Sequence, residues 1–213
     1  FSDHGANRLG ASALMQGLSD GYFVIPYTMQ NYLSDQIQVP HIDTKAPEFD
    51  AAEKAVQAEI DRIYNIKGDE SVDHIHKKLY HIMWDYVGMA RNEAGLKKAL
   101  AMLKDIRKEF KEHVRIPGDK EGLNVELDKA IHLRDFITMG ELIAYDALHR
   151  EESCGGHFRE EHQTEEGEAK RDDEHFFYVG AWEYQGNDET APVLVKEPLE
   201  YEIIKVQTRN YKN

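Results

Sequence analysis

The sequence predicts a mainly α fold, in which an antiparallel bundle of three or four long helices precedes a small C-terminal α+β piece. One observation is that apolar residues recur at three- and four-residue steps between Pro47 and Arg150, as in helices that bury one face. The other is that β-branched and aromatic runs such as Phe176-Phe177-Tyr178-Val179 follow residue 150, separated by turn residues. We therefore expect three parts, residues 1–46, 47–150 and 151–213.

Composition narrows the classes of partner. The 213 residues include Lys+Arg 26 and Asp+Glu 40, a net charge of −14, which disfavours nucleic acid and anionic membranes as partners. No stretch approaches the roughly 18 apolar residues of a membrane span, so we expect no direct membrane insertion. Cys154 is the only cysteine, so no internal disulfide and no thiolate cluster can form.

The first part is predicted to be helical from Ala11 to about Asp35, with a break between Gly17 and Gly21 and a kink at Pro26. Its apolar residues form no single stripe, which is typical of a helix buried on several sides in a larger domain. Without that domain, this surface should be exposed. The proline-containing segment 39–47 is the best candidate for a domain boundary.

Four helices are predicted in the second part, over about 47–65, 71–90, 93–113 and 124–150. Pro47 suits a first helical turn, and Ser71 is a candidate N-cap. Each apolar stripe is expected to face the bundle core. For the last helix the stripe is Leu127, Ile131, Phe136, Ile137, Met139, Ile143 and Ala147.

In the third part, Ser153-Cys154-Gly155-Gly156 should end the last helix. Residues 159–174 are mostly charged and are expected to form a surface loop. Strands are predicted around 176–184, 193–195 and 201–206, with a hairpin-like turn at 185–188.

The candidate chemistry lies in the opening stretch His4-Gly5-Ala6-Asn7-Arg8-Leu9-Gly10. Glycine lets a backbone turn sharply and approach a ligand, and the small residues that follow can begin a helix with free N–H groups. Arg8 has the planar fork that binds a carboxylate with two hydrogen bonds. On spacing alone, Arg8 is either a ligand residue or a structural residue of a turn, and His4 is open to the same two interpretations.

This stretch resembles the flavoprotein subunit of succinate dehydrogenase and fumarate reductase. The resemblance implies that Arg8 binds a carboxylate of the C4 dicarboxylate substrate beside the flavin of FAD, and that Ala11, Ala13 and Leu14 are neighbours of the flavin. The usual pattern has asparagine and serine where this chain has Ser12 and Ala13, so backbone contacts are expected there in place of side-chain contacts.

Later segments share the resemblance. Residues 83–92 resemble the end of the second bundle helix in that family. Ser153-Cys154-Gly155-Gly156-His157-Phe158-Arg159 and Arg171-Asp172-Asp173-Glu174 resemble two family motifs, with Cys154 and Gly156 replacing arginine and alanine. His157 and Arg159 are expected to be structural or interface residues, because in the family this segment braces the C-terminal piece. Arg171 is assigned to the same class, and so is His4, since a lone histidine among glycines is more often structural. The histidines show no zinc-type spacing, so no metal site is expected.

The resemblance further implies FAD in the intact subunit, succinate and fumarate as substrates, and an iron–sulfur subunit and a membrane anchor subunit as partners. It implies a peripheral location at the cytoplasmic side of the inner membrane. Since no Gly-x-Gly-x-x-Gly fingerprint occurs, we expect a C-terminal fragment that lacks most of the active site and is inactive alone. Without the resemblance, the bundle also fits a non-enzymatic helical scaffold or adaptor.

Overall fold

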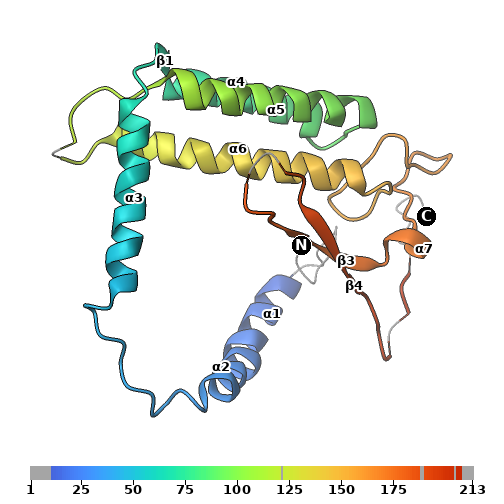
Figure 1. The fold of residues 1–213 in the computed structure, drawn as a ribbon. Coiled ribbons are helices and arrows are strands. Elements are labelled where there is room, and N and C mark those ends of the chain that lie inside the picture. Colours follow the sequence, from blue (N-terminus) through green and yellow to red (C-terminus); the bar gives the residue numbers. More distant parts are fainter. Residues whose placement is uncertain (1–10, 121, 188–189, 204, 208–213) are drawn as a thin grey trace.

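The computed structural model describes residues 11–120, 122–187, 190–203 and 205–207 and shows a mainly helical chain with a small C-terminal sheet (Figure 1). The sequence prediction of this fold class is thereby confirmed at that level. The elements, in order, are α1 (Ser12–Ser19), the π-helical turn η1 (Asp20–Val24), α2 (Ile25–Leu33), α3 (Pro47–Asn65), β1 (Glu70–Ser71), α4 (Val72–Val87), α5 (Glu93–His113), β2 (Val114–Arg115), α6 (Val125–His149), α7 (Asp173–Phe176), β3 (Tyr178–Glu183) and β4 (Val193–Pro198).

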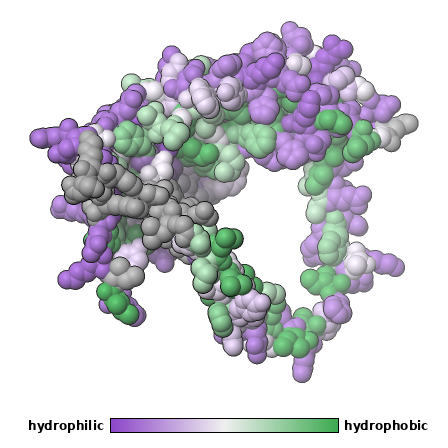
Figure 2. Space-filling view, turned by 180° about the vertical axis from the view of Figure 1, so that it is seen from behind, coloured by the Kyte–Doolittle hydropathy of each residue, from purple (hydrophilic) through white to green (hydrophobic). Residues whose placement is uncertain are grey.

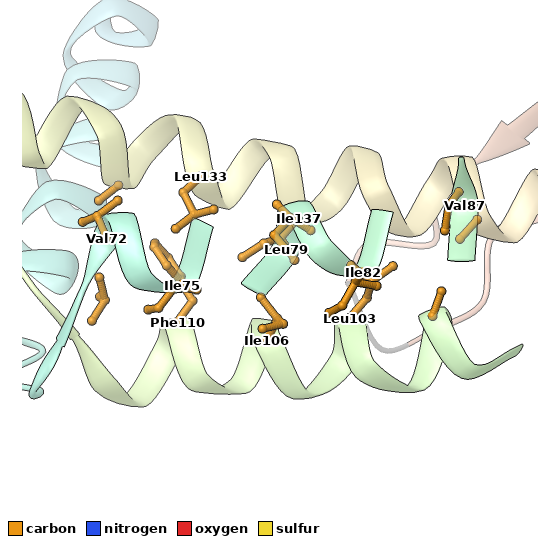
Figure 3. Close-up of a cluster of buried hydrophobic side chains, with 14 of the residues drawn as sticks. Val72, Ile75, Leu79, Ile82, Val87, Leu103, Ile106, Phe110, Leu133 and Ile137 are labelled. Carbon is orange, nitrogen blue, oxygen red and sulfur yellow. The ribbon is translucent and has the colours of Figure 1, made fainter. Parts of the chain in front are cut away.

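Helices α4, α5 and α6 pack together around the apolar core (Figure 3). Ser71 and Asn92 cap α4 and α5, each accepting a hydrogen bond from a backbone N–H three residues later. The short strands β1 and β2 pair in parallel, which ties the start of α4 to the end of α5. At this junction an added Cβ on Gly68 would lie 1.9 Å from the His113 carbonyl oxygen, so the crossing requires glycine.

The buried face of α6 differs from the predicted stripe. Its buried residues are Ala130, Leu133, Ile137, Gly140, Ala144 and Ala147. Small residues let α6 approach α4 closely, and a Cβ on Gly140 would lie 3.1 Å from Met83 Sδ. Phe136, Met139 and Ile143, which the apolar pattern assigned to the core, are instead 48%, 53% and 44% exposed. The prediction missed that close packing selects alanine and glycine over larger apolar residues.

Helix α3 has the predicted bounds, but it extends away from the other three long helices (Figure 1). Ile63 is its only buried residue, and Phe49 and Val56 are 51% and 61% exposed. The expectation that its apolar stripe packs in the bundle was therefore wrong within the described chain. Helix α3 is amphipathic, but no described element covers its apolar face along most of its length.

Helices α1 and α2 are joined through η1 without the predicted break. Pro26 has no N–H, and its ring crowds the carbonyl of Tyr22, so a wider π-helical turn just before it relieves the clash. No residue of α1, η1 or α2 is buried. We call α1, η1 and α2 together the arm. Figure 2 shows hydrophobic surface along the arm, and also on the parts of α3 and of the layer of long helices that face the open space between them and the arm.

Strands β3 and β4 pair antiparallel from Tyr178↔Pro198 to Glu183↔Val193. Tyr178 and Trp182 point toward α6, and Trp182 donates a hydrogen bond from Nε1 to Asp146 Oδ1 at 2.8 Å. The strand predicted around 201–206 is absent from the described residues there. Pro198 ends β4 because it has no N–H to continue the ladder. Across the part of the chain that the structure describes, none of the helices has the length and apolarity needed to cross a bilayer.

Candidate functional site: the start of α1 and a buried arginine cluster

His4 and Arg8 lie outside the described residues, so the geometry begins at Ala11. Ala11 has a φ of 61° and is the N-cap of α1. This left-handed conformation is uncommon for a residue with a Cβ, and it lies directly before the first residue of α1. The Ala11 methyl group cannot accept a hydrogen bond, and the first turn of α1 contains no acidic side chain.

The start of α1 therefore offers backbone N–H groups and the positive end of a helix dipole to a neighbouring group. Ala13 is partly exposed and Leu14 is 76% exposed. Small side chains at 11 and 13 leave the backbone accessible, and Leu14 adds an apolar contact. The residues present thus fit a flat group that carries polar edges, such as the flavin that the sequence resemblance implies.

A second constellation lies at the end of α6, where residues 150–159 fold back on the helix. Glu152, Ser153, His157 and Arg159 are only 3%, 0%, 5% and 2% exposed. The segment turns through a pair of backbone hydrogen bonds between Cys154 and His157. The sequence interpretation placed residues 159–174 in a surface loop. Residues 160–174 are exposed or partly exposed, but Arg159 is buried, because charge alone does not reveal a guanidinium that is hydrogen-bonded in the interior.

Arg159 caps α6 from its C-terminal end. Its Nη1 donates hydrogen bonds to the carbonyl oxygens of Ala147 at 2.9 Å and Leu148 at 3.2 Å, and its Nε contacts Glu161 Oε2 at 3.2 Å. The last carbonyls of a helix have no intrahelical donor, and a cation there is also favoured by the dipole. Ser153 Oγ holds the backbone of Arg159 through two further hydrogen bonds of 2.8 and 3.1 Å.

His157 completes this cap. Its Nε2 lies 2.8 Å from the Arg150 carbonyl oxygen, so Nε2–H is the donor and the ring is held in that tautomer. Burial lowers the pKa of His157, and the nearby cations Arg91 and Arg159 lower it further, against the opposing influence of the Arg150 carbonyl and Asp146. The neutral imidazole therefore belongs to the folded state.

Arg150 joins the cluster to the C-terminal hairpin. Its guanidinium donates to Glu152 Oε1 at 2.9 Å and to the carbonyl oxygens of Phe176 at 3.1 Å and Tyr178 at 3.2 Å. The other carboxylate oxygen of Glu152 accepts from the Asp172 N–H at 2.8 Å. Sequence reasoning did not select Arg150 or Glu152, and their one signal was a charged pair directly after a helix end.

Arg91 brings the loop between α4 and α5 to the same place. Its N–H donates to the Phe158 carbonyl at 3.2 Å, and its carbonyl accepts from the Glu160 N–H at 2.9 Å. Burial and the charge of Arg159 lower the pKa of Arg91. The motif that the sequence singled out at 153–159 is thus fixed by the segment that it singled out at 83–92.

Arg171 lies nearer the surface, where it forms a bidentate ion pair with Asp173, and its Nη1 donates to the Gln207 carbonyl at 3.2 Å. The structure thus brings His157 and Arg159 together, and it places Arg171 in the segment directly before α7. Ala11, Ala13 and Leu14 belong to the exposed arm and do not pack on this cluster.

Two other candidates have no distinctive chemistry here. Cys154 is partly buried, and burial raises the pKa of its thiol, which favours the unreactive protonated form. Among the described residues, no group of three or more His, Cys, Asp or Glu side chains is arranged to hold a metal ion.

Residues 76–211 match the family model described as the fumarate reductase flavoprotein C-terminus. The chain belongs to this family. An uncharacterized FAD-dependent oxidoreductase of Methanocaldococcus jannaschii is 32% identical over 166 residues, which cover 74% of this chain and 26% of that protein. The fumarate reductase flavoprotein subunit of Proteus vulgaris is 28% identical over 203 residues, covering 95% of this chain and 31% of that protein.

The fold is shared with a quinol fumarate reductase FrdA chain of E. coli, at a TM-score of 0.72 and 23% identity, over 96% of this chain and 33% of that one. The chain therefore spans about a quarter to a third of the length of the proteins it resembles. In this chain, the sequence motifs that carry the resemblance lie just before α1 and in the buried arginine cluster.

Proposed function

We propose that the chain is the C-terminal part of the FAD-containing subunit of a succinate:quinone oxidoreductase or fumarate reductase, which interconverts succinate and fumarate. The observation that carries the proposal is the family match over residues 76–211, combined with the sequence stretch His4–Gly10 and the helix start at Ala11 that follows it. The match favours this function over the helical scaffold, because a scaffold requires neither feature.

In this proposal, Arg8 binds one carboxylate of the substrate and fixes its orientation, which is worth several kcal/mol when the reacting atoms are held in place. Ala11, Ala13 and Leu14 contact the flavin, through the backbone at 11 and 13 and through the apolar side chain at Leu14. When bound, FAD supplies the hydride acceptor of the reaction. The arm of α1 and α2 follows the Arg8 stretch in sequence, and its exposed apolar residues fit against the part of the subunit that holds most of the FAD.

The same proposal divides the chain at residues 46 and 150. Residues 1–46 are the C-terminal end of the FAD-binding domain with its linker, residues 47–150 form the helical domain, and residues 151–213 form the C-terminal segment. The cluster around Arg159 and His157 would brace that segment on α6. An iron–sulfur subunit and a membrane anchor subunit would complete a complex in which this subunit is peripheral, at the cytoplasmic side of the inner membrane.

Flavin content and succinate turnover test the proposal. The intact subunit, purified with its partners, should contain FAD and reduce an artificial electron acceptor when succinate is added. The chain of 213 residues alone should be colourless and inactive. An intact subunit that contains no flavin, or one whose flavin is not reduced by succinate or reoxidised by fumarate, would contradict the assignment.

A further inference from the structure

A pocket of about 300 Å³ lies between α5, α6 and the C-terminal hairpin. Its volume is at the lower end of the roughly 300–1,000 Å³ found for ligand pockets, so it suits a molecule of one or two rings. Two of its walls are the aromatic rings of Tyr145 and Trp182, whose centroids lie 4.9 Å apart in an edge-to-face arrangement. Neither the family match nor the proposed reaction uses this pocket.

Among the described residues, three charged side chains line the pocket, namely Lys104, Arg107 and Glu141. On the floor, Arg107 and Glu141 form a bidentate pair whose side chains are 13% and 20% exposed, and Arg107 Nη2 also contacts Thr138 Oγ1 at 3.3 Å. The positive charge of Arg107 and the negative charge of Glu141 therefore neutralise each other. Lys104, one turn away on α5, also lines the pocket and is exposed, and it forms no ion pair with any residue that the structure describes.

The rings are held rigidly. Trp182 donates its Nε1–H to Asp146 Oδ1 at 2.8 Å, and Tyr145 packs on it from α6. Asp146 itself is not part of the pocket lining. The pocket thus offers aromatic rings held in place and, on exposed Lys104, an ammonium with no ion pair among the described residues, which suits a flat apolar body that carries one negative charge.

We propose that this pocket binds a small aromatic carboxylate, with its ring packed against Tyr145, Trp182 and Tyr184 and its carboxylate on Lys104. The ammonium contributes a charge-assisted hydrogen bond, which a neutral ligand of the same shape cannot receive from it with equal strength. The proposal is independent of succinate and fumarate chemistry, because it involves neither Arg8 nor the start of α1.

The two tryptophans provide a direct test with the chain of 213 residues. The indole N–H signals of Trp84 and Trp182 are assigned by comparison with Trp84→Phe, and then followed by NMR during titration with naphthoate or its uncharged amide. Trp84 is 70% exposed on α4, outside the pocket lining, so it reports nonspecific binding. We expect a saturable shift of the Trp182 signal by naphthoate, with no saturable shift of Trp84.

Variants separate the parts of the proposal. Lys104→Gln should weaken naphthoate binding about tenfold and leave the amide unchanged, whereas the control Lys111→Gln, on the same helix but outside the pocket lining, should change neither. Ala191→Phe should fill the pocket and abolish both. Absence of a saturable Trp182 shift overturns the proposal, and so does naphthoate binding that Lys104→Gln leaves intact. Each result can be obtained whether or not the parent subunit oxidises succinate.

Discussion

Replacing Arg159 by methionine tests whether the buried cluster holds the C-terminal segment on α6. Methionine keeps much of the apolar length of the side chain but removes the guanidinium, which is 2% exposed with the rest of the residue. The change leaves the carbonyls of Ala147 and Leu148 without their donor and Glu161 without its cation.

The expected cost follows from these contacts. A hydrogen bond to a charged group contributes about 1.5–3 kcal/mol, and an unsatisfied buried carbonyl costs about 1–3 kcal/mol. The pair with Glu161 adds little, because the Glu161 side chain is 39% exposed. Removal of the guanidinium also relieves its repulsion of Arg91, which offsets part of the loss. We therefore expect Arg159→Met to lower the free energy of unfolding by about 2–4 kcal/mol.

Urea denaturation followed by far-UV circular dichroism and by tryptophan fluorescence measures this loss. Trp182 lies on the hairpin, so fluorescence measured in a Trp84→Phe background reports the segment that the cluster is proposed to hold. The matched control is Arg62→Met, because Arg62 forms its ion pair within α3 and its side chain is 42% exposed. That change should cost at most about 1 kcal/mol. An Arg159→Met variant as stable as this control would refute the reasoning.

The remaining predictions concern caps, pH and close packing. Ser71→Ala and Asn92→Ala should each lower the free energy of unfolding by about 1 kcal/mol, because each removes a side-chain acceptor at a helix start. The control is Ser34→Ala, since Ser34 follows the end of α2 and caps no helix start. A melting temperature of either cap variant equal to that of Ser34→Ala would contradict this prediction. The pKa of His157 is lowered in the folded state, so as pH falls below about 6.5 the unfolded chain binds the proton first and stability decreases. His157→Gln should remove that part of the pH dependence in parallel denaturation series, and an unchanged slope would contradict the buried neutral ring. Gly68→Ala should destabilise the chain by at least about 1–3 kcal/mol, because the methyl group would meet the His113 carbonyl, whereas Gly122→Ala, with open space around it, should change stability little.

The helices could be predicted because periodicity records which face is buried. The third predicted helix has the observed bounds of α5, since Asn92 caps its start and its stripe of large apolar residues faces the core. The face of α6 could not be found in the same way. Its contact with α4 depends on Gly140 and alanines, and small residues carry almost no periodic hydrophobic signal.

Other features depend on partners that are distant in sequence. The stripe of α3 predicted a packed helix, but Phe49 and Val56 are exposed because no described element covers them. Arg159 was expected near the surface because its neighbours are charged, and its burial depends on the α6 carbonyls that it reaches from another segment. For the candidate site, the sequence offered Arg8 between two glycines, and the structure adds the left-handed Ala11 that begins α1.

The most direct test of the central claim is the kinetics of succinate oxidation by the intact subunit carrying Arg8→Ala, compared with Arg115→Ala as a control on β2. Loss of a charged partner for a bound carboxylate costs about 2–5 kcal/mol, so kcat/KM for succinate should fall by at least about thirtyfold. Flavin content and the circular dichroism of the helices should stay unchanged, and Arg115→Ala should retain full turnover. Wild-type kcat/KM in Arg8→Ala would contradict the assignment of this turn as the dicarboxylate site.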